Sequence, residues 1–166
     1  MGGAALRDLA LLRLRRGPLA LALLVLFLDQ LTKWWVVTQV MTPPRVIEVT
    51  GFFNIVMVWN RGVTFGLFGM GGDAMRWALV AGALVVTGFL LLWLARTGDR
   101  LLGLALGAVV GGALGNVVDR VIYGKVADFL DFHLSGWHWP AFNLADSAIV
   151  CGVGFIVLHS FRTPPE

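Results

Sequence analysis

The stretch LLGLALGAVVGGALGNVVDRVI, residues 101–122, is the most informative part of this chain for its architecture. Residues 101–115 are all apolar or glycine, and a helix of about 20 mostly apolar residues is long enough to cross a bilayer. Small residues spaced by four allow two membrane helices to approach closely. The glycines at this spacing are Gly103, Gly107, Gly111 and Gly115. The stretch is therefore predicted to be a membrane helix at the centre of a bundle.

Three further apolar stretches have a similar length, and they run over about 18–37, 74–95 and 141–161. The chain of 166 residues is 58% hydrophobic and 14% charged, whereas soluble domains are about half apolar and about a quarter charged. A soluble domain of this size has too much surface for its volume to bury so many apolar side chains. We therefore predict one membrane domain over residues 1–166, an all-α membrane protein with four transmembrane helices.

A small extracytoplasmic β-sheet is predicted between the first two helices, in the loop over about 45–66. Residues 52–59 are rich in β-branched and aromatic side chains and are too few to span a bilayer. Gly51 precedes this run, and the turn residues Asn60-Arg61-Gly62 follow it. The pattern indicates a strand and a turn that border the functional site.

Basic residues predict the orientation of the helices, because cytoplasmic loops carry more lysine and arginine than outer loops. The longer loops of one side hold Arg45, Arg61 and Lys125. The other side is richer in basic residues, namely Arg7, Arg13, Arg15, Arg16, Arg96, Arg100 and Arg162. We therefore predict a bacterial inner-membrane protein with both termini in the cytoplasm. The net charge of +3 is modest and suits a membrane surface; nucleic-acid binding is not predicted.

Ionisable side chains inside membrane segments are costly and therefore mark candidate functional sites. Asp29 and Lys33 lie four residues apart in the first helix, where they share a face and can pair. In the third helix, Asn116, Asp119 and Arg120 share one face near its outer end. The adjacent charges of Asp119 and Arg120 are compatible either with a structural ion pair or with substrate binding.

Two more carboxylates are expected at a similar depth. Asp128 follows the third helix, and Asn143 and Asp146 share a face near the start of the fourth, after Pro140. Two neighbouring carboxyl groups in a low-dielectric site split their pKa values, so one is protonated while the other is charged. In an aspartyl hydrolase the charged group takes a proton from water, and the protonated group polarises the scissile carbonyl. The residues alone leave both Asp119 and Asp128 open as the partner of Asp146.

Other chemistries have little support in the sequence. The histidines His133, His138 and His159 lack metal-ligand spacing, and the single cysteine, Cys151, excludes an intrachain disulfide. No G-x-S-x-G motif or phosphate-binding loop occurs. We therefore predict neither a metal ion nor another cofactor.

The order of the motifs resembles the lipoprotein signal peptidase (signal peptidase II) family, and the resemblance covers nearly the whole chain. The motifs are Asp29-Gln30-x-x-Lys33, the strand with Asn54, Asn60-Arg61-Gly62 with Phe65-Gly66, Gly115-Asn116-x-x-Asp119-Arg120, Val126-x-Asp128-Phe129 and Phe142-Asn143-x-Ala145-Asp146. This chain carries Val63-Thr64 where family members often have alanine.

The resemblance implies an intramembrane aspartyl endopeptidase that removes the signal peptide from bacterial prolipoproteins, on the N-terminal side of a lipid-modified cysteine. It implies that Asp128 and Asp146 are the catalytic pair. Asp29, Lys33 and Asp119 are expected to support the site. The implied partners are diacylglyceryl-modified prolipoproteins, membrane lipids and inhibitors of the globomycin class. The residues expected to bind substrate or inhibitor are Asn54, Asn116, Arg120 and Asn143.

Two other functions stay open from the sequence. A small proton-coupled transporter or channel could use buried carboxylates as a relay, but a relay needs polar groups across the whole membrane. Here the polar groups gather at one depth. A non-catalytic scaffold for membrane partners has no need of two inward carboxylates beside two asparagines.

Overall fold

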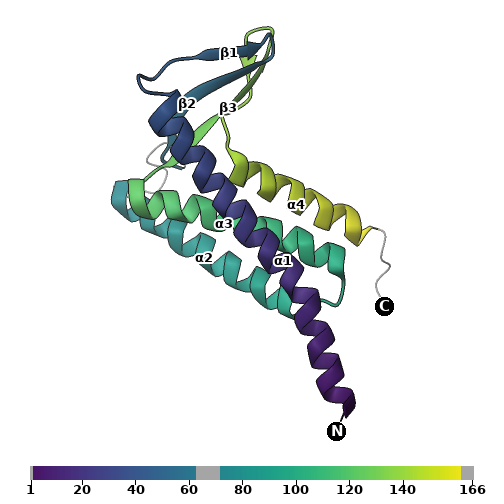
Figure 1. The fold of residues 1–166 in the computed structure, drawn as a ribbon. Coiled ribbons are helices and arrows are strands. Elements are labelled where there is room, and N and C mark those ends of the chain that lie inside the picture. The colour runs from purple at the N-terminus through teal and green to yellow at the C-terminus, as the bar shows by residue number, and fades with distance from the viewer. Residues whose placement is uncertain (1, 63–71, 162–166) are drawn as a thin grey trace.

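In this computed structural model, which describes residues 2–62 and 72–161, four α-helices pack side by side and a small sheet covers one end of them (Figure 1). A short π-helix, η1 (Val36–Val40), continues the first helix toward the sheet. The start of α1 and the end of α4 lie at the end of the helices away from the sheet. The helices are α1 (Gly2–Trp35), α2 (Gly72–Arg96), α3 (Arg100–Tyr123) and α4 (Leu144–Ser160).

Among the described residues, three helical segments are long and apolar enough to cross a membrane. The first is Arg16–Val40, which consists of the later part of α1 and all of η1. The others are Asp73–Arg96 of α2 and Arg100–Tyr123 of α3. The fourth helix is also apolar but has 17 residues, which is short for a span of the bilayer. The predicted helical fold is thus confirmed with three such helices, and a fourth span stays a prediction.

α3 lies at the centre of the bundle, as the glycine spacing predicted, and it packs against α1, α2 and α4. A Cβ atom on Gly107 or Gly111 would collide with the backbone carbonyl oxygen of Pro18 or Ala22 in α1. Gly112 faces α4 in the same way. Because these positions carry no side chain, the helix backbones approach closely and the polar end of α3 is held between α1 and α4.

The sheet has four antiparallel strands within the described residues, in the order β1-β2-β3-β4. The strand predicted over residues 52–59 is confirmed as β2, and the expected end of that loop, residues 63–66 with the Val63-Thr64 departure and Phe65-Gly66, lies outside the described residues. The strands are β1 (Ile47–Thr50), β2 (Phe53–Asn60), β3 (Val126–Leu134) and β4 (Trp137–His138).

β3 is a correction to the sequence analysis, which predicted no strand after the third helix. Gly124 ends α3 with φ +72°, a left-handed conformation that glycine adopts without strain, and the chain turns directly into β3. Asp128 and Asp131 interrupt the apolar pattern of this strand, which is why periodicity failed to predict it. The pairing of β2 with β3 shifts between Ile55 and Val58, so β2 carries one extra residue there.

α4 begins at Leu144, three residues later than predicted, because Asn143 caps it. The Asn143 side chain accepts from the Asp146 backbone N–H, and the Asp146 carboxylate accepts from the Asn143 backbone N–H. Phe142, just before the cap, pairs with Leu130 of β3. Asp146 therefore lies in the first turn of α4, beside the sheet.

Candidate active site

Asp128 and Asp146 come from two different elements and share one neighbour, Asn143. Asp128 lies on β3 and is 1% exposed, whereas Asp146 is half-buried. Asn143 Nδ2 donates to Asp128 Oδ1 at 2.7 Å, and the Asn143 backbone N–H donates to Asp146 Oδ2 at 3.3 Å. The two carboxylates singled out from the sequence are thus joined through a single asparagine.

The second oxygen of each carboxylate also accepts a hydrogen bond from an asparagine. Asn60, at the end of β2, donates to Asp128 Oδ2 at 3.0 Å. Asn116 of α3 donates to Asp146 Oδ1 at 2.7 Å. Four amide donors therefore fix the orientation of the two carboxyl groups. Asn116 and Asn143, which the resemblance implied as substrate-binding residues, are among them.

Burial raises the pKa of Asp128 to about 6, and the charge of nearby Asp146 acts in the same direction. The hydrogen bonds from Asn60 and Asn143 favour the charged form and oppose this rise. Asp128 consequently keeps its proton to a higher pH than an ordinary aspartate does. This is the property required of the protonated member of a carboxyl pair.

A buried lysine lies next to the pair. Lys33 Nζ is 2.8 Å from Asp29 Oδ2 and 3.0 Å from Asp119 Oδ2, and it donates to Asn116 Oδ1 at 3.0 Å. The predicted pairing of Asp29 with Lys33 is confirmed. The structural pair between Asp119 and Arg120, one of the two interpretations, is not found among the described residues: Asp119 forms its ion pair with Lys33.

Arg120 is half-buried beside the same group of residues. Its NH1 donates to the Asn116 backbone carbonyl at 3.3 Å. Its Nε is buried and has no hydrogen-bond partner among the described residues. A buried donor without a partner is costly, so this N–H is available to an incoming acceptor.

Asn54 and Asn60, both on β2, contact different aspartates of β3. Asn54, expected to bind substrate, donates its side-chain hydrogen bond to Asp131 Oδ2 at 3.0 Å. Asn60 contacts Asp128 but was treated only as a turn residue. The signal that could have identified Asn60 is its place in the motif Asn60-Arg61-Gly62, which the resemblance already included.

A cavity of about 420 Å³ opens onto Asp128. Its lining includes Asn60, Asp128 and Arg61 on the sheet side and Pro140 and Ala141 from the segment before α4. The cavity gives a ligand or a water molecule access to one member of the carboxyl pair.

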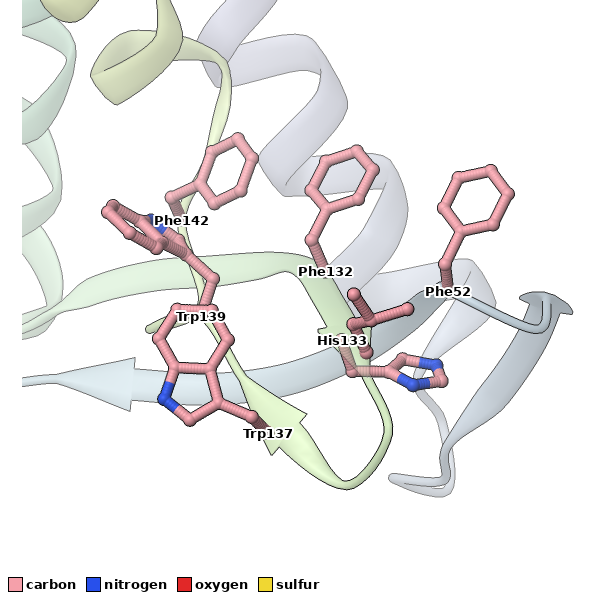
Figure 2. Close-up of a pocket in the computed structure, with 7 residues that line it drawn as sticks. Phe52, Phe132, His133, Trp137, Trp139 and Phe142 are labelled. Atoms are coloured by element: carbon pink, nitrogen blue, oxygen red, sulfur yellow. The ribbon is translucent and has the colours of Figure 1, made fainter.

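A second cavity, of about 460 Å³, is lined mainly by aromatic side chains of the sheet (Figure 2). The rings of Phe52 and Phe142 flank that of Phe132, with centroid distances of 6.5 and 5.9 Å. Trp137 and Trp139 from the β4 region complete this surface, and both are more than half exposed. Such a surface is typical of proteins that meet the membrane–water interface.

No group of three or more histidine, cysteine, aspartate or glutamate residues that could hold a metal ion occurs in the described parts of the chain. The fold and the site together define a class: a membrane protein with a pair of hydrogen-bonded aspartates where the helical bundle meets a small sheet.

Comparison with known proteins identifies the family within this class. Residues 21–162 match the family model of signal peptidase (SPase) II. The chain is similar to two proteins named lipoprotein signal peptidase. That of Methylorubrum extorquens is 47% identical over 155 residues, covering 92% of this chain and 89% of that protein. That of Paraburkholderia phytofirmans is 48% identical over 145 residues, covering 87% and 84%.

Two solved structures, each described as a bacterial membrane enzyme, are 28% identical in sequence, with TM-scores of 0.74 and 0.77. The matches cover 87% and 89% of this chain, and 87% and 94% of the solved chains. The chain belongs to the signal peptidase II family, and that membership implies a membrane protease. The family resemblance is thereby confirmed, and the protease prediction is favoured over a transporter or a scaffold.

Proposed function

We propose that this protein is an aspartyl endopeptidase of the bacterial inner membrane that removes signal peptides from prolipoproteins. The cleaved bond lies on the N-terminal side of a diacylglyceryl-modified cysteine. The names of the relatives support the substrate class. The observation that carries the catalytic type is the bridging of Asp128 and Asp146 by Asn143, since a hydrogen-bonded carboxyl pair is what aspartyl hydrolysis requires.

Asp146 acts as the general base and Asp128 as the general acid. Asp146, whose two oxygens are oriented by amide hydrogen bonds, removes a proton from the attacking water. Asp128, whose pKa burial raises to about 6, donates its proton as a hydrogen bond to the scissile carbonyl oxygen. As the tetrahedral intermediate collapses, Asp146 passes the proton that it took from water to the leaving amine, the amide bond breaks and the pair returns to its starting state.

Polar side chains around the pair hold the substrate. The buried Nε–H of Arg120 has no partner among the described residues, and it donates to a backbone carbonyl of the substrate. Asn116 and Asn143 keep the two carboxylates in place. Inhibitors of the globomycin class occupy the same space in this proposal. Asn54, which donates a hydrogen bond to Asp131, helps to bind the substrate from the neighbouring part of the sheet.

The protein spans the membrane four times, with α4 as the fourth span, and the sheet and active site lie at the outer face. The start of α1 and the end of α4 lie together at the end of the helices away from the sheet, which supports two cytoplasmic termini. The aromatic cavity between Phe52 and Trp139 lies in the outer interface, where it meets membrane lipids.

The direct test is cleavage of a lipid-modified prolipoprotein by purified variants. Asp128→Asn and Asp146→Asn should each abolish turnover while the protein stays folded, because the change removes proton chemistry with little change of volume. Asp131→Asn is the comparison: it alters a buried aspartate of the same strand that accepts from Asn54 and contacts His138. It should keep most of kcat, and any effect through Asn54 should fall on KM.

Substantial cleavage by either Asp128→Asn or Asp146→Asn would refute the pair. An active Asp128→Asn variant beside an inactive, folded Asp119→Asn variant would assign the pair to Asp119 and Asp146 instead. Circular dichroism and thermal unfolding in detergent establish the folded state of each variant.

A further inference from the structure

The residue before each aspartate of the pair is held by a carboxylate from the helical bundle. Ala127, which precedes Asp128, donates its backbone N–H to Asp119 Oδ2 at 3.2 Å. Ala145, which precedes Asp146, donates its backbone N–H to Asp29 Oδ1 at 2.9 Å. Both acceptors are at most 1% exposed. The backbone on which each catalytic group is mounted is therefore fixed by a buried anion.

The two anions are joined to each other. Lys33 Nζ lies between them, at 2.8 Å from Asp29 Oδ2 and 3.0 Å from Asp119 Oδ2. Gln30 Nε2 also contacts both carboxylates, at 3.2 Å from Asp29 Oδ2 and 2.9 Å from Asp119 Oδ1. We call Asp29, Gln30, Lys33 and Asp119 the Lys33 cluster. It connects the first turn of α4 to the start of β3 through side chains of α1 and α3.

The cluster occupies a site that is shaped for it. A Cβ atom on Gly115 of α3 would collide with Asp29 Oδ2, so only glycine leaves room for that carboxylate. Lys33 is 4% exposed and is shared by both buried carboxylates, each of which would lose its ion pair by moving away from it. The positions of the two backbone N–H groups are consequently coupled.

We propose that Asp29, Lys33 and Asp119 are positioning residues that set the spacing between Asp128 and Asp146 by holding the backbone N–H of Ala127 and Ala145. This inference rests on the proposed function of the two aspartates. Lys33 also helps to position the Asp146 carboxylate, because it donates to Asn116, which in turn donates to Asp146 Oδ1. The cluster does not touch the reacting atoms.

Lys33 also places a positive charge near the pair. The charged groups around Asp128 are Lys33 from α1, Asp119 and Arg120 from α3, and Asp146 from α4. Beside β2, the neutral Asn60 contacts Asp128 and Arg61 lines the same cavity. The charge of Lys33 favours the ionised form of Asp128. Removing it should extend the protonated form of Asp128 to higher pH.

The test compares kcat, KM and the pH profile of cleavage. Lys33→Met should lower kcat by about 10- to 100-fold, the effect of misplacing catalytic groups by about 1 Å, and should change KM far less. The alkaline limb of kcat/KM should move to higher pH. Asp29→Asn retains an oxygen acceptor for the Ala145 N–H, and Asp29→Leu does not. The kcat of Asp29→Asn should therefore be clearly higher than that of Asp29→Leu.

Leu106→Ala provides the control for a loss of stability alone. Leu106 is fully buried in α3, and it precedes Gly115, where α3 meets Asp29, by about 14 Å of helix. The variant should lower the unfolding temperature without moving the pH profile. A native kcat and pH profile in Lys33→Met, or equal kcat in Asp29→Asn and Asp29→Leu, would overturn the positioning role. Normal cleavage by Asp128→Asn would instead overturn the proposed function.

Discussion

The raised pKa of Asp128 serves the proposed mechanism but has a cost in stability. Burial raises this pKa from an ordinary 3.8 to about 6, so the folded protein holds the proton more tightly than the unfolded chain does. The group therefore stabilises the fold fully below its unfolded pKa, and the contribution is lost as the pH rises through about 6. The carboxyl group that we propose as the general acid thus costs folding free energy at neutral pH.

We predict that Asp128→Asn removes this dependence on pH. The unfolding free energy of the variant, relative to that of the native chain, should rise by on the order of 2 kcal/mol between about pH 4 and pH 8. The measurement is thermal unfolding of both proteins in detergent across this range.

Asp131→Asn serves as the comparison. Although burial acts to raise it, hydrogen bonds from His138 and Asn54 hold the pKa of Asp131 below its ordinary value. Its own ionisation therefore affects stability only below about pH 4, and the gap between this variant and the native chain should change most there. A gap for Asp128→Asn that does not change between pH 4 and pH 8 would show that the pKa of Asp128 is not raised.

Among individual residues, the sequence predicted which polar side chains lie near one another better than it predicted which of them form ion pairs. Asp128, Asp146, Asn116 and Asn143 were all predicted, because polar residues in apolar segments are conspicuous. The partner of Asp119 was not, since Lys33 lies 86 positions away and only the packing of α1 against α3 brings them within 3.0 Å. Side-chain partners across a bundle depend on helix rotation, which spacing within one helix does not determine.

Among the helices and strands, the glycine face of α3 determines how closely the helices pack. A Cβ atom on Gly111 would meet the Ala22 backbone and the Val25 side chain of α1. A Cβ atom on Gly82 of α2 would meet no neighbouring atom of the described residues within 4 Å. The same substitution should therefore have opposite effects at the two positions.

We predict that Gly111→Ala destabilises the protein by about 1–3 kcal/mol, because two backbones must separate. Gly82→Ala should instead stabilise it by up to about 1 kcal/mol through helix propensity. Unfolding in a mixed detergent–denaturant series measures both. Equal effects at the two positions would show that α1 and α3 are not packed at Gly111.

The elements that the sequence failed to predict are those that depend on neighbours. β3 carries two aspartates that obscure its pattern, and it forms a strand because β2 pairs along it. The start of α4 is set by the reciprocal hydrogen bonds of Asn143 and Asp146. The long apolar helices were predicted well, because their length and composition alone select a membrane helix.

In the molecule as a whole, the start of α1 and the end of α4 lie at the end of the bundle away from the sheet (Figure 1). His159, near the end of α4, lies 2.9 Å from Asp99 between α2 and α3, so this connection lies at the same end of the bundle. If the basic residues face the cytoplasm, the sheet must face outward.

We predict that a reporter fused at Thr97-Gly98 is cytoplasmic and that one inserted at Ser135-Gly136 is extracytoplasmic. The asymmetry of arginine residues and the position of the Asp99–His159 contact support this orientation. Alkaline phosphatase and fluorescent-protein fusions in whole cells measure the two sides. An active phosphatase at Thr97-Gly98 would reverse the orientation and place the sheet in the cytoplasm.

The extra residue of β2 has a consequence for how this chain tolerates changes in length. Between the pairs Ile55–Leu130 and Val58–Asp128, β2 advances one residue more than β3 does. Because successive side chains of a strand point to opposite faces, Ile55 and Val58, three residues apart, share a face only through this extra residue. Deleting it would restore regular pairing and leave Asn60 on the face of Asp128, whereas deleting Trp59 would turn Asn60 to the opposite face. A deletion at residues 56–57 should thus be less damaging than a deletion at Trp59.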